Sequence, residues 1–376
     1  MKRAALLLVL LLLGASLADD SVDRIPDTWR PFATTKLTRL TRVLGEEKPL
    51  NDRFTHFTLS PDGKWVAFCD KVLQVATRKV GLELSTPSTD NRENQLVATI
   101  FRGEGLRRFS PDGKRLVACS PDQGGGDCPV AVSFDVKTRA ESRFITPDVN
   151  TGCPWDMAFI QSSNVAAFVL STGGVWLWGV DGSRVPTRLV PATEVAKSTP
   201  ERRSAWSIDV SPDGRRALTC AGPEVTLWDL GTAKNRVLEK VPPREKAPLV
   251  FRAVFTKDGK DGLSVDGKGV VKKWNLSSGA ATKIGELPAN ESWSAIGAPS
   301  PPCVFSRDRK LLVYAHGRGT LSIFDIAAAQ EIDRIDLAPV GDALTDLVLA
   351  PDDRTMYVGT ATTKKILVFE INVPLK

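Results

Sequence analysis

The stretch Phe109-Ser110-Pro111-Asp112-Gly113-Lys114 decides the fold, because near copies of it recur along the chain. In each close copy Pro fixes φ, the Asp side chain bonds to the local backbone and Gly accepts a positive φ, so the stretch predicts a tight turn between two strands. The other copies lie at Leu59–Lys64, Phe159–Ser163, Val210–Arg215, Phe255–Gly259, Phe305–Arg309 and Leu349–Asp353. Their second residues fall at 60, 110, 160, 211, 256, 306 and 350, with spacings of 50, 50, 51, 45, 50 and 44 residues. A period of this size indicates a repeat architecture.

A second feature, an aromatic residue followed by Asp, Asn, Glu or Gly, comes about 18 residues after most of these turns. It occurs at Trp178-Gly179, Trp228-Asp229, Trp274-Asn275, Phe324-Asp325 and Phe369-Glu370, and later in the second repeat at Phe134-Asp135. The first repeat has no clear copy. Short apolar runs between turn residues predict four strands per repeat, which is the blade of a β-propeller. We therefore expect an all-β fold, a seven-bladed β-propeller of four-stranded antiparallel blades.

The repeats resemble those of the WD40 family, whose third strand ends in the form seen intact at Leu227-Trp228-Asp229-Leu230. The resemblance covers residues 34–376 and implies the propeller fold far more specifically than any function. The family's Gly-His dipeptide before the first strand is absent from all seven repeats, so its buried His–Asp network is not expected here. Ser-Pro-Asp-Gly-Lys without Gly-His also resembles the WD40-like repeats of exported TolB-type propellers, which is the alternative within the same architecture.

The two ends of the repeat region are expected to complete one blade together. After the last predicted strand, residues 366–371, only five residues remain, so the seventh blade lacks a fourth strand. Residues 34–44 precede the first turn, belong to no repeat and alternate Leu and Val with Lys and Arg. Pairing these segments would protect two open strand edges. We predict that the N-terminal strand closes the ring.

Residues 1–18 read as a secretory signal peptide. Lys2 and Arg3 precede an apolar run of about ten residues, and Ser16 and Ala18 place small side chains at positions −3 and −1 of a cleavage site. The apolar run is too short for a membrane span, which needs roughly 20 residues. We expect an exported protein, secreted or in the periplasm or cell envelope, in which residues 19–33 form a leader and residues 34–376 a single propeller.

Composition narrows the classes of partner. The 376 residues include 50 Lys and Arg against 44 Asp and Glu, a formal charge of +6 that falls to +4 once Lys2 and Arg3 are removed. The two signs are interspersed, whereas a nucleic-acid binder concentrates basic residues on one face. We expect no nucleic-acid partner, no membrane span, no cofactor and a monomer.

The six cysteines fall into a set of three, a pair and a single residue. Cys69, Cys119 and Cys220 stand nine residues after their turns, where other repeats carry Val, Ala or Gly, so they predict a small packing position rather than a metal site. Cys303 is expected to be buried. Cys128 and Cys153 each precede Pro in loops predicted on one face of neighbouring blades, so a disulfide between them is one interpretation.

No catalytic motif occurs in the mature chain: a nucleophile elbow, a zinc-binding helix and a phosphate loop are all missing. An enzyme that uses a carboxylate-lined channel, such as a propeller hydrolase or lactonase, stays open as an alternative. Asn275 and Asn290 begin glycosylation sequons, which matter only if the secretory route is eukaryotic. Aromatic residues five positions before three turns, at Trp155, Trp206 and Phe251, are either an apolar binding patch or blade core, and we favour core.

Polar residues near the starts of the first strands, with two histidines, are our candidates for a binding face. They are His56, Asp156, Ser207, Arg252, His316 and Asp346. Propellers commonly receive partners on the loop-bearing face, an inference from the fold alone. The sequence therefore predicts an exported, non-catalytic scaffold that binds other proteins or peptides there, with a channel-centred enzyme and an envelope-associated TolB-like propeller as alternatives.

Overall fold

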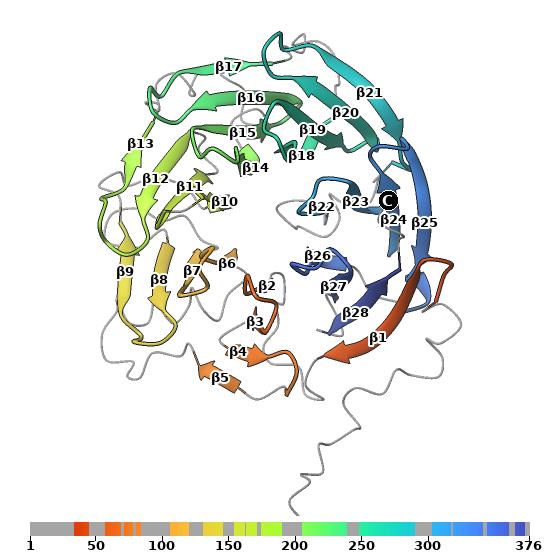
Figure 1. The fold of residues 1–376 in the computed structure, drawn as a ribbon, viewed down its shortest axis with the longest axis horizontal. Coiled ribbons are helices and arrows are strands. Elements are labelled where there is room, and N and C mark those ends of the chain that lie inside the picture. Colours follow the sequence, from red (N-terminus) through yellow and green to blue (C-terminus); the bar gives the residue numbers. More distant parts are fainter. Residues whose placement is uncertain are drawn as a thin grey trace, which may run out of the picture.

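Seven four-stranded antiparallel sheets surround a common axis in the computed structural model, so the protein is the predicted all-β, seven-bladed propeller (Figure 1). The structure describes residues 34–44, 57–68, 71–77, 80–83, 106–119, 131–145, 154–161, 163–170, 174–189, 205–238, 248–289, 303–316, 319–340, 344–360 and 365–372. The predicted signal peptide and leader, residues 1–33, lie outside these ranges. Within them, no helix is long and apolar enough to cross a membrane.

Each blade runs from an innermost strand near the axis to an outermost strand at the rim (Figure 1). The first blade contains β2 (Phe57–Leu59), β3 (Trp65–Phe68), β4 (Lys71–Gln74) and β5 (Val80–Glu83), and the second β6 (Arg107–Phe109), β7 (Arg115–Cys119), β8 (Ala131–Asp135) and β9 (Glu141–Phe144). The third contains β10 (Pro154–Phe159), β11 (Val165–Leu170), β12 (Val175–Gly179) and β13 (Thr187–Arg188), and the fourth β14 (Ala205–Val210), β15 (Arg216–Ala221), β16 (Glu224–Asp229) and β17 (Asn235–Val237). The fifth contains β18 (Val250–Phe255), β19 (Asp261–Asp266), β20 (Val270–Asn275) and β21 (Ala281–Glu286), and the sixth β22 (Cys303–Phe305), β23 (Leu311–His316), β24 (Thr320–Asp325) and β25 (Gln330–Asp336). The seventh contains β26 (Leu344–Leu349), β27 (Thr355–Thr360), β28 (Ile366–Ile371) and β1 (Thr38–Leu44).

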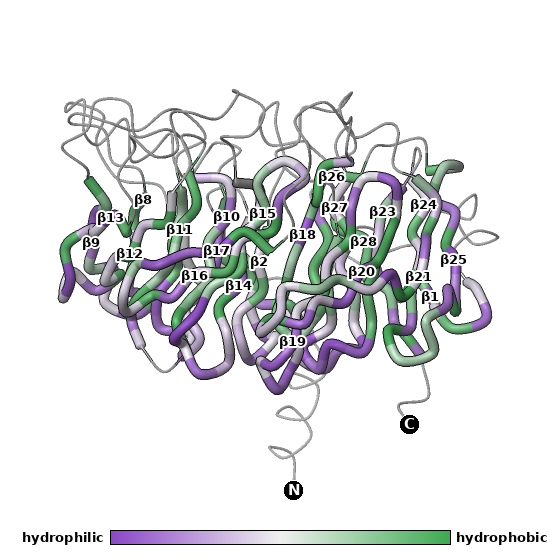
Figure 2. The backbone as a smooth tube through the Cα atoms, turned by 90° about the horizontal axis from the view of Figure 1, so that it is seen from above, coloured by the Kyte–Doolittle hydropathy of each residue, from purple (hydrophilic) through white to green (hydrophobic). Residues whose placement is uncertain are grey.

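The repeated turns join the first and second strands of the blades, as their chemistry predicts. In the second blade Ser110 Oγ donates to Asp112 Oδ1 over 2.6 Å, and the same oxygen accepts the Lys114 N–H over 3.0 Å. Gly113 has φ of 69°. Figure 2 shows the ring edge-on, with such hydrophilic turns gathered along one edge. These side chains therefore satisfy the backbone of the turn locally.

Apolar side chains fill the spaces between neighbouring blades. Trp228 of β16 packs against Ala167, Val169 and Leu177 of the third blade, and the equivalent Trp274 of β20 is 1% exposed. Each of these aromatic rings therefore belongs to the interface with the preceding blade. The first blade differs, because Leu73 stands at this position of β4 and is only partly buried.

The ring closes as predicted, by pairing the two ends of the repeat region. β1 runs antiparallel to β28 from Thr38 opposite Ile371 to Leu44 opposite Ile366. Thr38 Oγ1 also donates to Asp333 of the sixth blade over 3.0 Å, and Thr35 Oγ1 donates to the same carboxylate. The N-terminal strand is thus the outermost strand of the seventh blade and is anchored to the sixth.

Candidate functional site

The innermost strands carry charged side chains that meet around the axis. Asp156 on β10, Ser207 on β14, Arg252 on β18 and Asp346 on β26 all stand four residues before the turn of their repeat, as the sequence placed them. His56 lies outside the described residues. The inner strand is an edge strand in every blade, so some of its backbone N–H groups have no partner strand. The contacts of these side chains show which of those N–H groups they bind.

Asp156 is the centre of the largest group. Its carboxylate accepts Arg108 Nη2 of the second blade over 2.7 Å and the N–H of Ile208 in the fourth blade over 3.1 Å. Arg252 of the fifth blade lies 3.8 Å away, and the Asp156 side chain is 5% exposed. A carboxylate this buried is stable as an ion only when charged and polar partners surround it. The three blades around the third therefore all contribute to holding Asp156.

The fourth blade repeats the arrangement two residues further along β14. Asp209 accepts the N–H of Phe255 in the fifth blade over 2.8 Å and pairs with Arg309 of the sixth blade at 3.1 Å. Ser207 Oγ accepts the N–H of Ala253, also in the fifth blade, over 3.4 Å. Each of these side chains accepts a backbone N–H from the inner edge strand of the next blade.

Asp346 does the same across the closure of the ring. Its carboxylate accepts the N–H of Phe57 on the first blade over 3.1 Å and that of its neighbour Leu347 over 2.8 Å. The seventh and first blades are not consecutive in sequence, so this bond complements the outer pairing of β1 with β28. The predicted polar positions are thus hydrogen-bonded between blades rather than directed only at solvent.

Two of the ion pairs join blades that are not neighbours. Arg252 to Asp156 connects the fifth blade with the third, and Arg309 to Asp209 connects the sixth with the fourth. The side chains of Arg108, Arg252 and Arg309 are 34%, 24% and 23% exposed, so screening by water weakens these pairs only in part. These ion pairs therefore connect the third to sixth blades near the centre of the ring. Among the described residues, no three His, Cys, Asp or Glu side chains are grouped as metal ligands would be.

His316 lies away from this group, at the end of β23. Its Nε2 lies 2.8 Å from Ser322 Oγ, which donates to Glu331 Oε1 over 2.7 Å, and Arg334 binds that carboxylate through two nitrogens. Burial and the positive charge of Arg334 lower the pKa of His316, so it is neutral at pH 7. Because fully buried Ser322 gives its proton to Glu331, His316 does not act as its base. The chain of bonds joins β23, β24 and β25.

The cysteines that the structure describes are buried thiols. Cys119, Cys220 and Cys303 are all buried, and burial raises the pKa of Cys220 to about 12 and that of Cys303 to about 11. The packing role predicted for Cys119 and Cys220 is confirmed, as is the burial of Cys303. Cys69 and the predicted pair Cys128 and Cys153 lie outside the described residues.

Two of the three aromatic residues before the turns, Trp155 and Phe251, belong to the core as favoured, whereas the side chain of Trp206 lies outside the described part of the structure. Phe251 is 4% exposed within the cluster between the fifth and sixth blades, and Trp155 packs against the cluster between the third and fourth. Two tryptophans of the third strands donate to a hydroxyl on the second strand of their own blade: Trp228 Nε1 to Thr219 Oγ1 and Trp274 Nε1 to Ser264 Oγ, both over 2.8 Å.

Reasoning from the sequence missed Arg108, Asp209 and Arg309. The first two share the strand parity of the predicted residues, two positions later, and that parity was the available signal. Arg309 occupies the turn position at which four other repeats have Gly, so its presence there was also a signal. Comparison of the chain with models of known protein families and with curated proteins gives no match.

Proposed function

We propose that this protein is an exported, WD40-like propeller that serves as a non-catalytic scaffold and binds other proteins or peptides on its loop-bearing face. The observation that carries the proposal is the engagement of the axial carboxylates. Asp156, Asp209 and Asp346 each accept a backbone N–H of the next blade, and the first two also pair with arginines. Groups used in this way stiffen a ring that presents loops to a partner.

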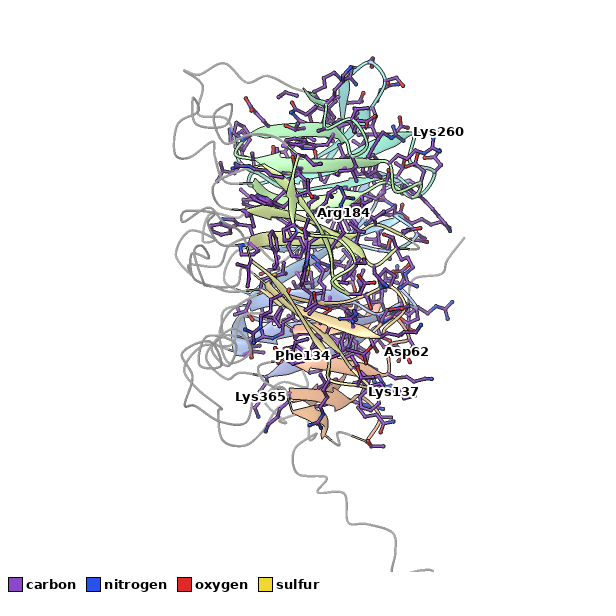
Figure 3. All side chains as sticks on the ribbon, turned by 90° about the vertical axis from the view of Figure 1, so that its left-hand side faces the viewer. Asp62, Phe134, Lys137, Arg184, Lys260 and Lys365 are labelled. Carbon is purple, nitrogen blue, oxygen red and sulfur yellow. The ribbon has the colours of Figure 1, made fainter. Side chains whose placement is uncertain are left out.

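The two faces of the ring provide a matched test. Lys268 and Lys365 lie at connections between second and third strands, on the loop-bearing face, whereas Lys137 and Lys260 lie in turns on the opposite face. Figure 3 shows Lys365 at one edge of the ring and Lys137 and Lys260 at the other. Charge reversal changes a partner's contact only where that partner docks.

The experiment is an affinity pull-down from the exported fraction with the full chain as bait. We expect a discrete partner that the K268E/K365E variant binds at least several-fold more weakly, while the K137E/K260E variant binds it as the parent chain does. Equal binding by both variants, or weaker binding only by the second, would contradict the assigned face. A bait that retains no protein under any condition would contradict the scaffold itself.

A further inference from the structure

A pocket of about 440 Å³ lies at the seam where the seventh blade meets the first. One wall comes from three adjacent strands of the seventh blade, β27, β28 and β1, and Val75 of the first blade faces them. The turn between β26 and β27 contributes Arg354, so the pocket opens toward the ring edge opposite the loops. Its volume is within the range of small-molecule sites.

The pocket exists because the first blade lacks the large aromatic residue of its third strand. Leu73 pairs with Val66 at the register where Trp228 pairs with Ala217 in the fourth blade. Leucine covers far less of the neighbouring blade than tryptophan does. The seventh blade compensates in part with Tyr357, which is 4% exposed. The outer part of the interface, next to Val75, remains open.

Strand register places a cation beside this apolar wall. Tyr357 lies opposite Val368, and Val368 lies opposite Arg42, so the three side chains form a row on one face of the blade. That face packs against the first blade, because Tyr357 and Val368 belong to the cluster that contains Phe57 and Val66. The row therefore combines an aromatic ring, an aliphatic side chain and a guanidinium within one pocket.

A comparison with the fourth blade shows that Arg42 is available. Arg236 occupies the equivalent position on β17 and donates to the carbonyl oxygens of Leu276 and, over 2.9 Å, Ser277 in the fifth blade. Arg42 makes no such bond to the described residues of the first blade, and the Arg354 side chain likewise has no hydrogen bond or ion pair with any residue the structure describes. Both arginines line the pocket.

Two carboxylates, Asp352 and Glu370, also line the pocket and balance the formal charge of its two arginines. The oxygens of Asp352 are held by its own turn, since they accept the N–H groups of Arg354 and Thr355 and the Thr355 hydroxyl. The side chains of Arg42 and Arg354 make no hydrogen bond with the described residues, so their N–H donors can bind an acceptor in the pocket. We infer that the seam pocket binds a small organic anion, a carboxylate or phosphate ester with a compact apolar body, whose charged end lies between Arg42 and Arg354 and whose apolar part lies on Tyr357 and Val75.

Isothermal titration calorimetry of the full chain tests this site with three probes: phenyl phosphate, phenylacetate and benzylamine. We expect one-to-one binding of at least one of the two anions and none of the cation, and the stronger anion identifies the preferred group. Arg42→Gln should weaken anion binding about tenfold, as for loss of one charged hydrogen bond. Val75→Phe should abolish it by filling the pocket.

Arg236→Gln is the matched control, because it removes the equivalent guanidinium at an interface where that group is hydrogen-bonded to the next blade, and it should leave anion affinity unchanged. Circular dichroism melts show whether each variant is folded, and Val75→Phe keeps the test valid if Arg42→Gln does not fold. Unchanged affinity in Val75→Phe, benzylamine binding as strongly as the anions, or no binding of either anion up to about 10 mM would overturn the inference.

Discussion

Two individual turn residues of this propeller also form contacts between blades. Gly63, Gly113, Gly214 and Gly259 occupy the same position with φ between 68° and 70°, where a side chain is strained. The sixth and seventh repeats place Arg309 and Asp353 there, with φ of 61° and 53°. Arg309 reaches Asp209, and Asp353 accepts the N–H groups of Arg307 and Asp308 in the neighbouring blade. At both positions a strained backbone conformation is tolerated because the side chain contacts another blade.

Asp353→Gly should therefore destabilise the protein, although glycine suits the backbone better. Glycine relieves roughly 1 kcal/mol of left-handed strain. It removes two hydrogen bonds to a carboxylate, each contributing about 1.5–3 kcal/mol, at the low end on an exposed turn. We expect a net loss of about 1–2 kcal/mol in urea unfolding, with a smaller loss for Asp353→Asn, which keeps an acceptor and tolerates this φ. An Asp353→Gly variant as stable as the parent would show that strain outweighs the contact.

At the scale of elements, the N-terminal strand decides whether the ring is closed. Leu40, Val43 and Leu44 on β1 are 4%, 2% and 8% exposed, and all three pack against other blades or β28. Without β1 these contacts vanish and β28 becomes an open edge.

Deleting residues 34–44 should lower the thermal midpoint sharply. Three buried apolar side chains are worth about 1.5–3 kcal/mol each, and a domain's whole stability is roughly 5–15 kcal/mol. We expect calorimetry to show a melt shifted down by more than about 10 °C or no cooperative transition. A synthetic peptide of residues 34–44 should restore part of the shift, while a peptide of the same composition in scrambled order should not. An unchanged melt would refute closure by this strand.

At the scale of the whole molecule, repetition adds up many small acid-sensitive contributions. Hydrogen bonds from the turn itself lower the pKa of Asp62, Asp213 and Asp258. In the third blade, hydrogen bonds from Ser183 and Asn164 lower the pKa of Asp181 to about 2. A carboxylate whose pKa is lower in the folded state than in the unfolded state stabilises the fold above about pH 4, and this stabilisation disappears as the pH falls toward 2.

The midpoint temperature of thermal unfolding should accordingly decrease as the pH is lowered from 4 to 2. Asp181→Asn should flatten this dependence slightly, because the amide has no proton to take up, and Glu224→Gln should serve as the comparison at a strand carboxylate outside the turns. Melts recorded at quarter-unit pH steps measure the slope. A midpoint independent of pH across this window would contradict the role of the turn aspartates.

Periodicity was enough to predict the seven blades and their closure, because each turn carries its own chemistry and the spacing repeats. Asp156 and Arg252 were predicted from strand parity alone. Their pairing was not, because contact between the third and fifth blades depends on the diameter of the ring, which no local spacing encodes. The seam pocket escaped for the same reason: the missing aromatic residue of the first repeat was visible, but its neighbour Tyr357 becomes known only when the ends meet.

The pairing of β1 with β28 has a consequence for biosynthesis. The partner of residues 38–44 is made more than three hundred residues later, so the seventh blade cannot assemble until β28 has emerged. Earlier blades can form as they appear. A chain that ended before β28 would leave β1 without its partner and the ring open. The last step of folding therefore depends on whether β28 has been made.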